Sequence, residues 1–298
     1  MIIALVGPTA VGKTKLSIEL AQEFNAEIVC VDSLVVYRDF NIGTAKPSSE
    51  DRKVVPHHVL DIVAPTELFT AHNFCEAATQ AIEKIQKKNK NVFLVGGSGL
   101  YLKALTQGMF KAPPSDPYIR QELEERLFQD PKALYEELCR VDAKASDIIH
   151  PHDHYRILRA MEVYQMTGKP FSHYHEEHVP KKTWTEKIVK IGLTLDREVL
   201  YQRIEERTAH MLKEGLVQEV EELKKKYSLS CKPFKSVGYK ETLQFLNHEL
   251  TQEEHPQKMT QATRYLAKGQ WTWFRADPEI SWFLPSDPAI HHKIAKLL

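Results

Sequence analysis

Short apolar runs alternate with amphipathic segments along much of the chain. Residues 2–6 are apolar throughout, which is typical of a strand buried on both faces, and apolar side chains then recur at helical spacing over residues 16–24. Further buried-strand patterns occupy residues 27–31, 91–95 and 188–195, and a shorter one lies within 56–62. Since strand patterns alternate with helical ones, the chain is predicted to form an α/β fold with a doubly wound parallel sheet.

The middle of the chain has a different pattern. A proline-rich connection at 112–117 is followed by helical periodicity from 118 to about 168, without any buried-strand pattern. We therefore predict a core domain formed by residues 1–112 and 186–298, interrupted by an all-helical insertion at 113–185. Within the core, helices are expected at 74–87, from Asp196 onward and at 260–274, and a short strand and a helix complete the chain.

The segment GPTAVGKT joins the first strand to the first helix and matches the phosphate-loop pattern GxxxxGKT. Its backbone N–H groups and the following helix N-terminus favour an oligophosphate, with Lys13 on the outer phosphates and the Thr14 hydroxyl on a magnesium ion. A glycine turn that binds nothing is the alternative. The motif does not say whether phosphate is transferred, hydrolysed or expelled as a leaving group. The residues of the loop are Gly7, Pro8, Thr9, Ala10, Val11, Gly12, Lys13 and Thr14.

Polar residues also follow two other predicted strands. Asp32 and Ser33 end the strand at 27–31, at the sheet edge where open α/β folds place their chemistry. Asp32 could hold magnesium, act as a general base or cap the next helix. The polar segment 37–47 is expected to be a loop over the site, and the glycine turn at 96–99 either approaches a ligand or allows close packing.

Several arginines share helix faces. Arg203 and Arg207 are four residues apart, so one of them could clamp the outer end of an oligophosphate, although ion pairs with nearby acids are the competing interpretation. Arg156 and Arg159 are three apart and also share a face, and Arg120 lies earlier in the same predicted insertion.

Overall charge does not indicate a polyanionic partner, because 40 basic residues balance 40 acidic ones among 298. Local charge does: residues 223–240 contain six lysines and no acid, with Tyr227, Phe234 and Tyr239 between them. This mixture could bind phosphates and offer stacking faces for a nucleic acid, or it could be a solvated helix end.

Other compositional features exclude more than they suggest. No apolar run approaches the ~20 residues of a membrane span, and no secretory leader is recognisable, so we expect a cytoplasmic protein with no membrane partner. The four cysteines are scattered, which argues against disulfides and a cysteine zinc site. Histidines cluster at 150–154 and 173–178, where metal binding is possible by composition but solvated or capping side chains are the commoner outcome.

Read together, seven stretches resemble the tRNA dimethylallyltransferase family, whose members prenylate an adenosine beside the tRNA anticodon. The phosphate loop is shared with many kinases, but DS followed by IGTAKP, together with GGSGLY, is specific to this family. The matching stretches are GPTAVGKT, VDSLVVYRDFNIGTAKP at 31–47, GGSGLYLKAL at 96–105, HPHDHYRILRAMEVY at 150–164, RIEERTAHML at 203–212, KSVGYKE at 235–241 and ATRYLAKGQWTWFR at 262–275.

The resemblance implies a P-loop NTPase-like core with a helical insertion that contacts tRNA. It also implies that the phosphate loop binds dimethylallyl diphosphate, and that Asp32 accepts the proton from N6 of adenine. Thr9, Lys13, Thr14 and Arg207 would hold the diphosphate together with Mg²⁺, so that Asp32, Thr9 and Arg207 are the expected catalytic residues.

The resemblance further assigns contact with the tRNA anticodon stem-loop to residues from both predicted domains. Those residues are Asp32, Ser33, Leu34, Val35, Ser98, Arg120, Tyr155, Arg156, Arg159, Lys235, Gly238, Tyr239 and Lys240. The chain departs from the family pattern at four positions: Val11 replaces a serine, Val35 a glutamine, Ser98 a threonine and Gly269 an arginine. The changes at 35 and 269 weaken any expectation of specific polar contacts there.

Transfer of a dimethylallyl group to a tRNA adenosine at position 37 is therefore the leading hypothesis, for an enzyme that we expect to be a monomer. A small-molecule P-loop kinase is the alternative, but it leaves the lysine stretch and the GTAKP segment unexplained. A GTP-dependent switch is disfavoured because the chain has no NKxD-type guanine-reading segment.

Overall fold

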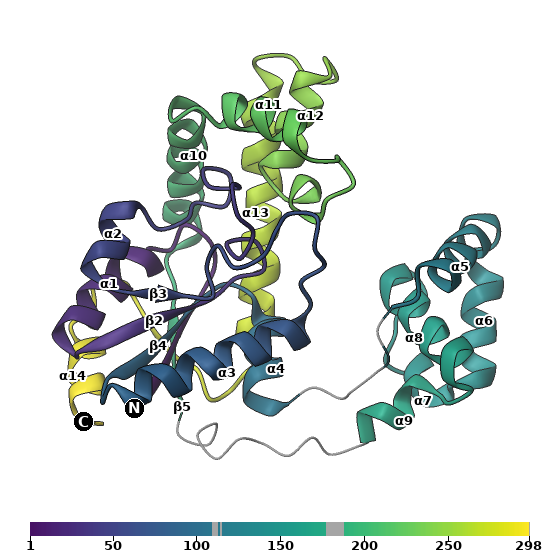
Figure 1. Cartoon of the computed structure of the whole chain (residues 1–298), viewed down its shortest axis with the longest axis horizontal. Coiled ribbons are helices and arrows are strands. Elements are labelled where there is room, and N and C mark those ends of the chain that lie inside the picture. Colours follow the sequence, from purple (N-terminus) through teal and green to yellow (C-terminus); the bar gives the residue numbers. More distant parts are fainter. Residues whose placement is uncertain (109–112, 114, 177–187, 298) are drawn as a thin grey trace. The chain divides into compact units, whose positions relative to one another are not determined.

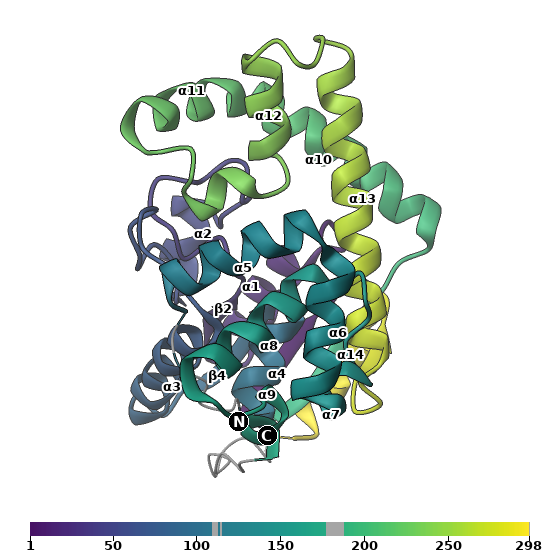
Figure 2. The same cartoon turned by 90° about the vertical axis from the view of Figure 1, so that its right-hand side faces the viewer.

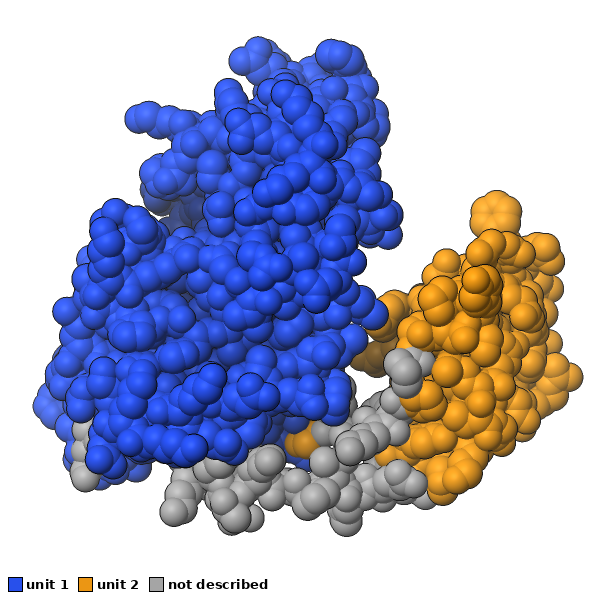
Figure 3. Space-filling view, viewed as in Figure 1, with its two compact units in different colours: residues 1–107, 182–298 blue, residues 108–181 orange. Residues whose placement is uncertain are grey.

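The computed structural model describes residues 1–108, 113, 115–176 and 188–297. Two compact units make up the chain, as Figure 3 shows. The first contains residues 1–107 and 182–298, and the second contains residues 108–181.

The first unit is built on a sheet of six parallel strands (Figure 1). Their spatial order is β3-β2-β4-β1-β5-β6, so consecutive strands along the chain are joined by crossovers that carry helices. This arrangement confirms the predicted doubly wound α/β fold. The strands are β1 (Ile2–Val6), β2 (Ala26–Val31), β3 (His57–His58), β4 (Asn91–Gly96), β5 (Ile188–Leu193) and β6 (Ser281–Phe283).

The register of the central strands brings their carboxyl ends to one level. Gly96 of β4 pairs with Val6 of β1 and with Val31 of β2, and Val6 also pairs with Gly192 of β5. The segments that leave β1, β2 and β4 therefore start side by side at the same edge of the sheet. These segments contain the phosphate-loop sequence, Asp32 and the glycine turn.

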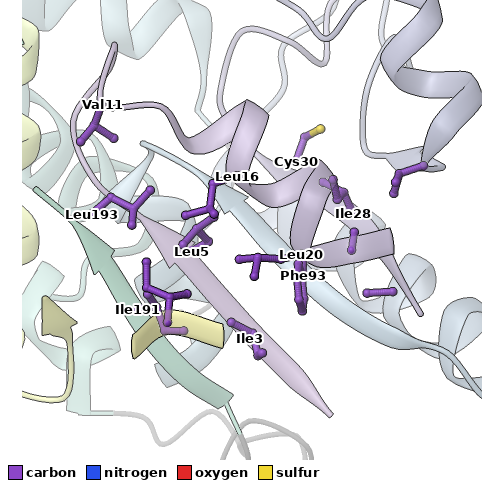
Figure 4. Close-up of a cluster of buried hydrophobic side chains, with 14 of the residues drawn as sticks. Ile3, Leu5, Val11, Leu16, Leu20, Ile28, Cys30, Phe93, Ile191 and Leu193 are labelled. Carbon is purple, nitrogen blue, oxygen red and sulfur yellow. The ribbon is translucent and has the colours of Figure 1, made fainter. Parts of the chain in front are cut away.

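Helices cover both faces of the sheet. Figure 4 shows Ile3 and Leu5 of β1 packed with Leu16 and Leu20 of α1 (Lys13–Glu23) in one buried cluster, which α14 (Ala289–Ala295) completes. The opposite face is covered by α3 (Ala71–Lys87), which contacts β2 and β4 and packs against α4 (Gly99–Gln107). Burial on both faces explains why the central strands are apolar throughout.

A second group of helices lies at the end of this unit farthest from the chain termini, in both Figures 1 and 2. It has its own hydrophobic cluster, in which Phe40 of the loop after β2 packs with Phe234 and Tyr239. The elements of this part are α10 (Arg197–Lys213), α11 (Leu216–Lys226), the 3₁₀ helix η2 (Lys232–Lys235), α12 (Tyr239–Leu246) and the amino-terminal half of α13 (Glu254–Arg275).

The second unit contains no strand within its described residues. Aspartates cap most of its helices, and Leu123, Leu138 and Met161 belong to a small core of their own. Its helices are α5 (Pro117–Gln129), α6 (Pro131–Val141), α7 (Ala143–Ser146), α8 (His154–Thr167) and α9 (Phe171–Glu176). Over the described ranges of both units, no helix combines the length and apolarity that crossing a membrane requires.

Some boundaries differ from the predicted ones. The strand expected within 56–62 has only two residues, because Val59 and Asp61 adopt left-handed φ angles of 57° and 55° that end the extended conformation. Helix α13 begins six residues before the predicted start at 260, and the short helix α2 (Ser49–Val54), which begins with a capping box at Ser48, was not predicted.

Candidate active site

The phosphate-loop sequence forms a tight turn between β1 and α1. Gly7 has a φ of 144°, and a Cβ there would lie 2.6 Å from the backbone oxygen of Leu193, so no other residue fits without moving β5. Gly12 has a φ of 106° and begins α1, and Ala10 also adopts a left-handed φ of 64°. The loop therefore has the sharply turned backbone and following helix N-terminus that an anion site needs.

Lys13 folds back over this loop. Its Nζ donates hydrogen bonds to the carbonyl oxygens of Gly7 and Pro8, at 2.9 and 2.7 Å. Burial and the charge of Arg207 together lower the pKa of Lys13 to about 7, against the opposing effect of the Asp32 charge. An anionic ligand in the loop would restore the full positive charge of this lysine, because it would offset the desolvation of the ammonium group.

Two arginines of α10 face the same loop. Arg203 donates from Nη1 to the carbonyl oxygen of Val11 at 3.2 Å, which ties α10 to the phosphate loop. Arg207 is half-buried, and burial lowers its pKa while the charge of Asp32 opposes that effect. Within the described residues neither arginine forms an ion pair, and Glu205 instead pairs with Arg264. The competing prediction, that Glu205, Glu206 or another nearby acid pairs with these arginines, is therefore wrong for the acids that the structure describes.

Asp32 follows β2 directly and is only partly exposed. Its Oδ1 accepts hydrogen bonds from the backbone N–H groups of Leu34 and Val35, at 2.8 and 3.4 Å. Burial raises the pKa of Asp32, and these N–H groups together with Lys13 and Arg207 offset only part of the increase. The next helix starts at Ser49, so Asp32 closes a turn and does not cap a helix. Its Oδ2 makes no hydrogen bond to any described residue and is available to a substrate.

These groups line one cavity of about 940 Å³. Phosphate-loop residues lie on one wall, and the turn after β2, the loop 43–47 and the segment 235–238 contribute to the others. The predicted site residues that line the cavity are Thr9, Ala10, Gly12, Lys13, Thr14, Asp32, Ser33, Leu34, Val35, Arg207, Lys235 and Gly238. The predicted loop at 37–47 thus does border the site.

The glycine turn after β4 is explained by close packing. A Cβ on Gly96 would lie 1.9 Å from the backbone oxygen of Val31, and one on Gly99 would lie 2.0 Å from the ring of Trp273. Ser98 faces β2, where its Oγ accepts a hydrogen bond of 3.2 Å from the backbone N–H of Ser33. Of the two predicted alternatives, close packing therefore accounts for these glycines. Ser98 binds the backbone of the residue after Asp32 and so helps to hold that segment in place.

Gln270 of α13 is a site residue that the sequence did not indicate. Its Oε1 accepts a hydrogen bond of 2.8 Å from the backbone N–H of Thr9, and its Nε2 donates to the carbonyl oxygen of Gly97 at 3.1 Å. Its only signal in the sequence is membership of the stretch 262–275, since neither partner lies near it along the chain.

Polar contacts, most of them partly buried, fix the loop that borders the cavity. The carboxylate of Glu219 in α11 accepts hydrogen bonds from the backbone N–H groups of Asn41 and Ile42 and from the Tyr239 hydroxyl, the last at 2.6 Å. Lys46, whose side chain is 2% exposed, pairs with Asp61 at 2.6 Å. The cavity wall formed by residues 43–47 is therefore preorganised.

The lysine-rich stretch 223–240 divides into engaged and exposed side chains. Lys226 pairs with Asp39, and Lys232 donates to the carbonyl oxygen of Phe69 at 3.3 Å. Lys235 and Lys240 are exposed, and Lys235 borders the cavity. The prediction that the aromatic residues of this stretch offer stacking faces is wrong for Phe234 and Tyr239, because both are buried in the hydrophobic cluster with Phe40.

In the second unit, Arg120, Tyr155 and Arg156 lie on α5 and α8. The guanidinium of Arg120 lies over the ring of Tyr155, 5.5 Å from its centroid, and Tyr155 is 72% exposed. Arg156 pairs with Asp153 at 3.3 Å. Arg120 also pairs with Glu124 at 2.8 Å, so these residues present the exposed Tyr155 ring together with two ion-paired arginines within this unit.

Arg159, unlike Arg156, is bound to a buried group of the second unit. It pairs with the fully buried Glu162 at 2.7 Å and donates to the carbonyl oxygen of Pro113 at 2.5 Å. The Glu162 carboxylate also accepts from the backbone N–H of Asp116 at 3.0 Å. Arg159 therefore fixes the start of this unit, in addition to any contact with a ligand.

Among the described residues, no three histidine, cysteine or acidic side chains lie close enough together to hold a metal ion. In the first histidine cluster, the ring nitrogen Nδ1 of His150 accepts from the backbone N–H of His152. The second cluster lies partly outside the described residues. At the cavity itself, the exposed Thr14 hydroxyl and the Asp32 carboxylate offer the oxygen ligands that suit Mg²⁺, which binds to few protein groups and retains phosphate and water ligands.

Comparison with known proteins places this site in context. The family model described as IPP transferase matches residues 35–277 of the chain. The tRNA dimethylallyltransferase 2 of Geotalea uraniireducens is 45% identical over 284 residues, covering 94% of this chain and 91% of that protein. The tRNA dimethylallyltransferase of Geobacter metallireducens is 44% identical with the same coverage.

Solved structures agree with the sequence relatives. The tRNA isopentenylpyrophosphate transferase of Bacillus halodurans superposes with a TM-score of 0.73 at 37% identity, covering 99% of this chain and 96% of that one. A eukaryotic dimethylallyltransferase captured in crystals acting on tRNA gives a TM-score of 0.81 at 30% identity, covering 97% of this chain and 74% of that one.

Proposed function

This chain belongs to the IPP transferase family, and we propose that it transfers a dimethylallyl group from dimethylallyl diphosphate to N6 of the tRNA adenosine at position 37, beside the anticodon. One observation carries the proposal: a phosphate loop and a carboxylate of raised pKa line the same cavity. The loop suits the diphosphate that leaves, and the carboxylate suits the proton that N6 loses.

The diphosphate is bound by the phosphate loop. The N-terminus of α1, with the backbone N–H groups of Lys13 and Thr14, would face the leaving group, and Lys13 would release the loop carbonyls to pair with it. Arg203 and Arg207 add positive charge from α10. As the bond between the allylic carbon and oxygen breaks, negative charge grows on the diphosphate, and these groups stabilise it.

Mg²⁺ fits the proposed donor site. Thr14 would hold the ion together with diphosphate oxygens, and Asp32 could approach it through water. When bound, the ion neutralises charge on the departing pyrophosphate.

Asp32 is the proposed general base. The exocyclic N6 of adenine is a weak nucleophile whose proton becomes acidic as the bond to the allylic carbon forms, and the carboxylate accepts that proton. The hydrogen bonds from Leu34 and Val35 hold Oδ1 and leave Oδ2 to face the acceptor. A raised pKa makes this carboxylate a stronger base than an exposed aspartate.

Recognition of the anticodon stem-loop is proposed for residues at the surface of both units. Lys235 and Lys240 supply cations near the cavity, and Arg120, Tyr155 and Arg156 supply cations and an aromatic ring in the second unit. The target base must leave its stack, which costs a few kcal/mol, and a single-stranded anticodon loop lowers that cost. Gly238 and the segment 33–35 would contact the tRNA at the cavity, whereas Tyr239 would support that contact from within the core.

The proposed reaction can be distinguished directly from that of a small-molecule kinase. The protein is incubated with unmodified tRNA and dimethylallyl diphosphate, and in parallel with ATP and small acceptors. We expect a prenylated adenosine and released pyrophosphate in the first mixture only. Phosphoryl transfer without prenylation would contradict the proposal.

The base assignment is tested with Asp32→Asn, which keeps an oxygen for the N–H group of Leu34 but removes the basic carboxylate. We expect pyrophosphate to bind as before and the single-turnover rate to fall by at least about 100-fold, the usual contribution of a general base. A single-turnover rate close to that of the wild type would exclude Asp32 from this role.

The tRNA contact is tested by changing Lys235 and Lys240 to alanine together. The KM for tRNA should rise and its salt dependence should flatten, while the KM for dimethylallyl diphosphate stays the same. Replacing Lys84 and Lys87, which lie at the end of α3 next to the opposite edge of the sheet, removes the same charge and serves as the control. An equal change in both variants would point to overall charge and not to a binding surface.

A further inference from the structure

The amide of Gln270 connects two loops of the candidate active site and so sets their relative position. One end holds the backbone of Thr9 in the phosphate loop, and the other holds the carbonyl oxygen of Gly97 after β4. These loops leave different strands at the carboxyl edge of the sheet. A single side chain from a distant helix therefore joins them, and both its donor and its acceptor are used.

The connection continues to the proposed base. Next to Gly97, the N–H of Ser98 donates to the carbonyl oxygen of Val31 at 3.2 Å, and Ser98 Oγ accepts from the N–H of Ser33 at the same distance. Asp32 lies between these two contacts. The path from the phosphate loop to the base thus runs through Gln270 and the glycine turn.

The helix that carries Gln270 is well anchored. The ring of Trp273, one turn further along α13, occupies the space where a side chain on Gly99 would lie. On the other side of α13, Arg264 pairs with Glu205 of α10 and stacks over Tyr201, with its guanidinium carbon 4.7 Å from the ring centroid. Because α10 also carries Arg203 and Arg207, α13 is packed against the helix that faces the leaving group.

From these contacts we infer that Gln270 is a positioning residue, which sets the phosphate loop at a fixed distance from the Asp32 segment. It acts through Thr9 and Gly97 on the alignment of donor and acceptor, and this inference rests on the proposed prenyl transfer. Neither near relative of glutamine can replace it: asparagine is one methylene shorter, and glutamate lacks the N–H that Gly97 accepts.

Alignment contributes most where the two reactants meet in the transition state, because a misplacement of about 1 Å can cost 100-fold in rate. The phosphate loop itself stays restrained by Lys13 and Arg203 when Gln270 is absent. Loss of Gln270 should therefore affect kcat far more than the binding of either substrate.

The experiment uses Gln270→Met in the full-length protein, a change that keeps the length of the side chain and removes both hydrogen bonds. We expect kcat for tRNA prenylation to fall by about 30- to 100-fold, while both KM values and the affinity for pyrophosphate change by less than about threefold. Gln261→Met, at an exposed position of the same helix, is the control and should match the wild type.

A second variant reaches the same contact from the other side. A Cβ on Gly97 would lie 2.3 Å from Nε2 of Gln270, so Gly97→Ala should displace the amide and reproduce the kcat defect. Since both changes break one connection, the double variant should be no slower than the more impaired single one. Multiplicative losses would show that the two residues act separately, and would overturn the inference.

The remaining outcomes are separable. An active wild type with an equally active Gln270→Met variant overturns only the positioning role. A variant that loses pyrophosphate affinity or thermal stability in proportion to kcat shows a structural residue, and also overturns it. A wild type that prenylates no tRNA refutes the proposed function, and the inference fails with it.

Discussion

Removing the Glu219 carboxylate should release the loop 41–47, which borders the cavity, from helix α11. In Glu219→Ala, the N–H groups of Asn41 and Ile42 and the buried Tyr239 hydroxyl lose their acceptor together. A buried polar group without a partner costs about 1–3 kcal/mol. The N–H of Asn41 is exposed and can turn to water, so the other two donors set the loss, which we expect to be about 2–4 kcal/mol of the free energy of unfolding.

Urea unfolding of the full-length protein measures this loss, with Glu222→Ala as the control. Glu222 is exposed on the same helix, and its replacement should change the free energy of unfolding by less than about 0.5 kcal/mol. Tyr239→Phe removes only the hydroxyl, so it should lose less than Glu219→Ala, and the two changes should not add in full.

Catalysis gives a second measurement of the same change. The kcat/KM for tRNA should fall at least tenfold because residues 43–45 border the cavity, whereas pyrophosphate affinity should persist because no contact of Glu219 involves the phosphate loop. The reasoning is refuted if Glu219→Ala unfolds at the same urea concentration as Glu222→Ala.

Two further predictions concern stability. Burial favours a higher pKa for Glu27, but hydrogen bonds from His58, Lys88 and Lys90 outweigh this effect and lower the pKa to about 2. The Glu27 carboxylate therefore stabilises the folded protein fully above its ordinary pKa of 4.5, and this stabilisation is lost as the pH falls from 4.5 toward 2. Urea titrations at pH 7 and pH 4 should show that Glu27→Gln costs about 1–3 kcal/mol at pH 7 and less at pH 4. Gly269→Ala should stabilise the protein by about 0.5–1 kcal/mol in thermal unfolding, because a Cβ there meets nothing within 4 Å in the helix interior.

The parts of the fold that the sequence predicted are those whose signals are contiguous. Apolar runs identified the main strands, and the helical periodicity after residue 117 corresponds to the helices α5 to α9. The phosphate-loop pattern and the polar end of β2 were recognisable for the same reason, because strand, loop and helix follow one another directly. The register of the parallel strands then brings Asp32 to the phosphate loop, which a doubly wound sheet implies without further information.

The rest of the site depends on contacts between residues far apart in the chain. Gln270 meets Thr9 across 261 positions, and Glu219 meets Ile42 across 177. Both are ordinary polar residues on helices, where an exposed side chain is the usual expectation. Neither periodicity nor local motifs carry information about such partners. The sequence could therefore predict the phosphate loop and the Asp32 segment, but not the side chains that hold the surrounding loops in place.

These distant contacts nevertheless leave a trace in the glycines. Gly43, Gly97 and Gly99 all have ordinary φ angles, so conformational freedom does not explain them. Each is glycine because a remote ring or amide occupies the place of its Cβ: Tyr239 at 2.4 Å, Gln270 at 2.3 Å and Trp273 at 2.0 Å, respectively. A glycine in a loop or after a strand that needs no unusual φ therefore marks a site of close approach, and these three glycines lie against side chains of the helices α12 and α13 that support the cavity.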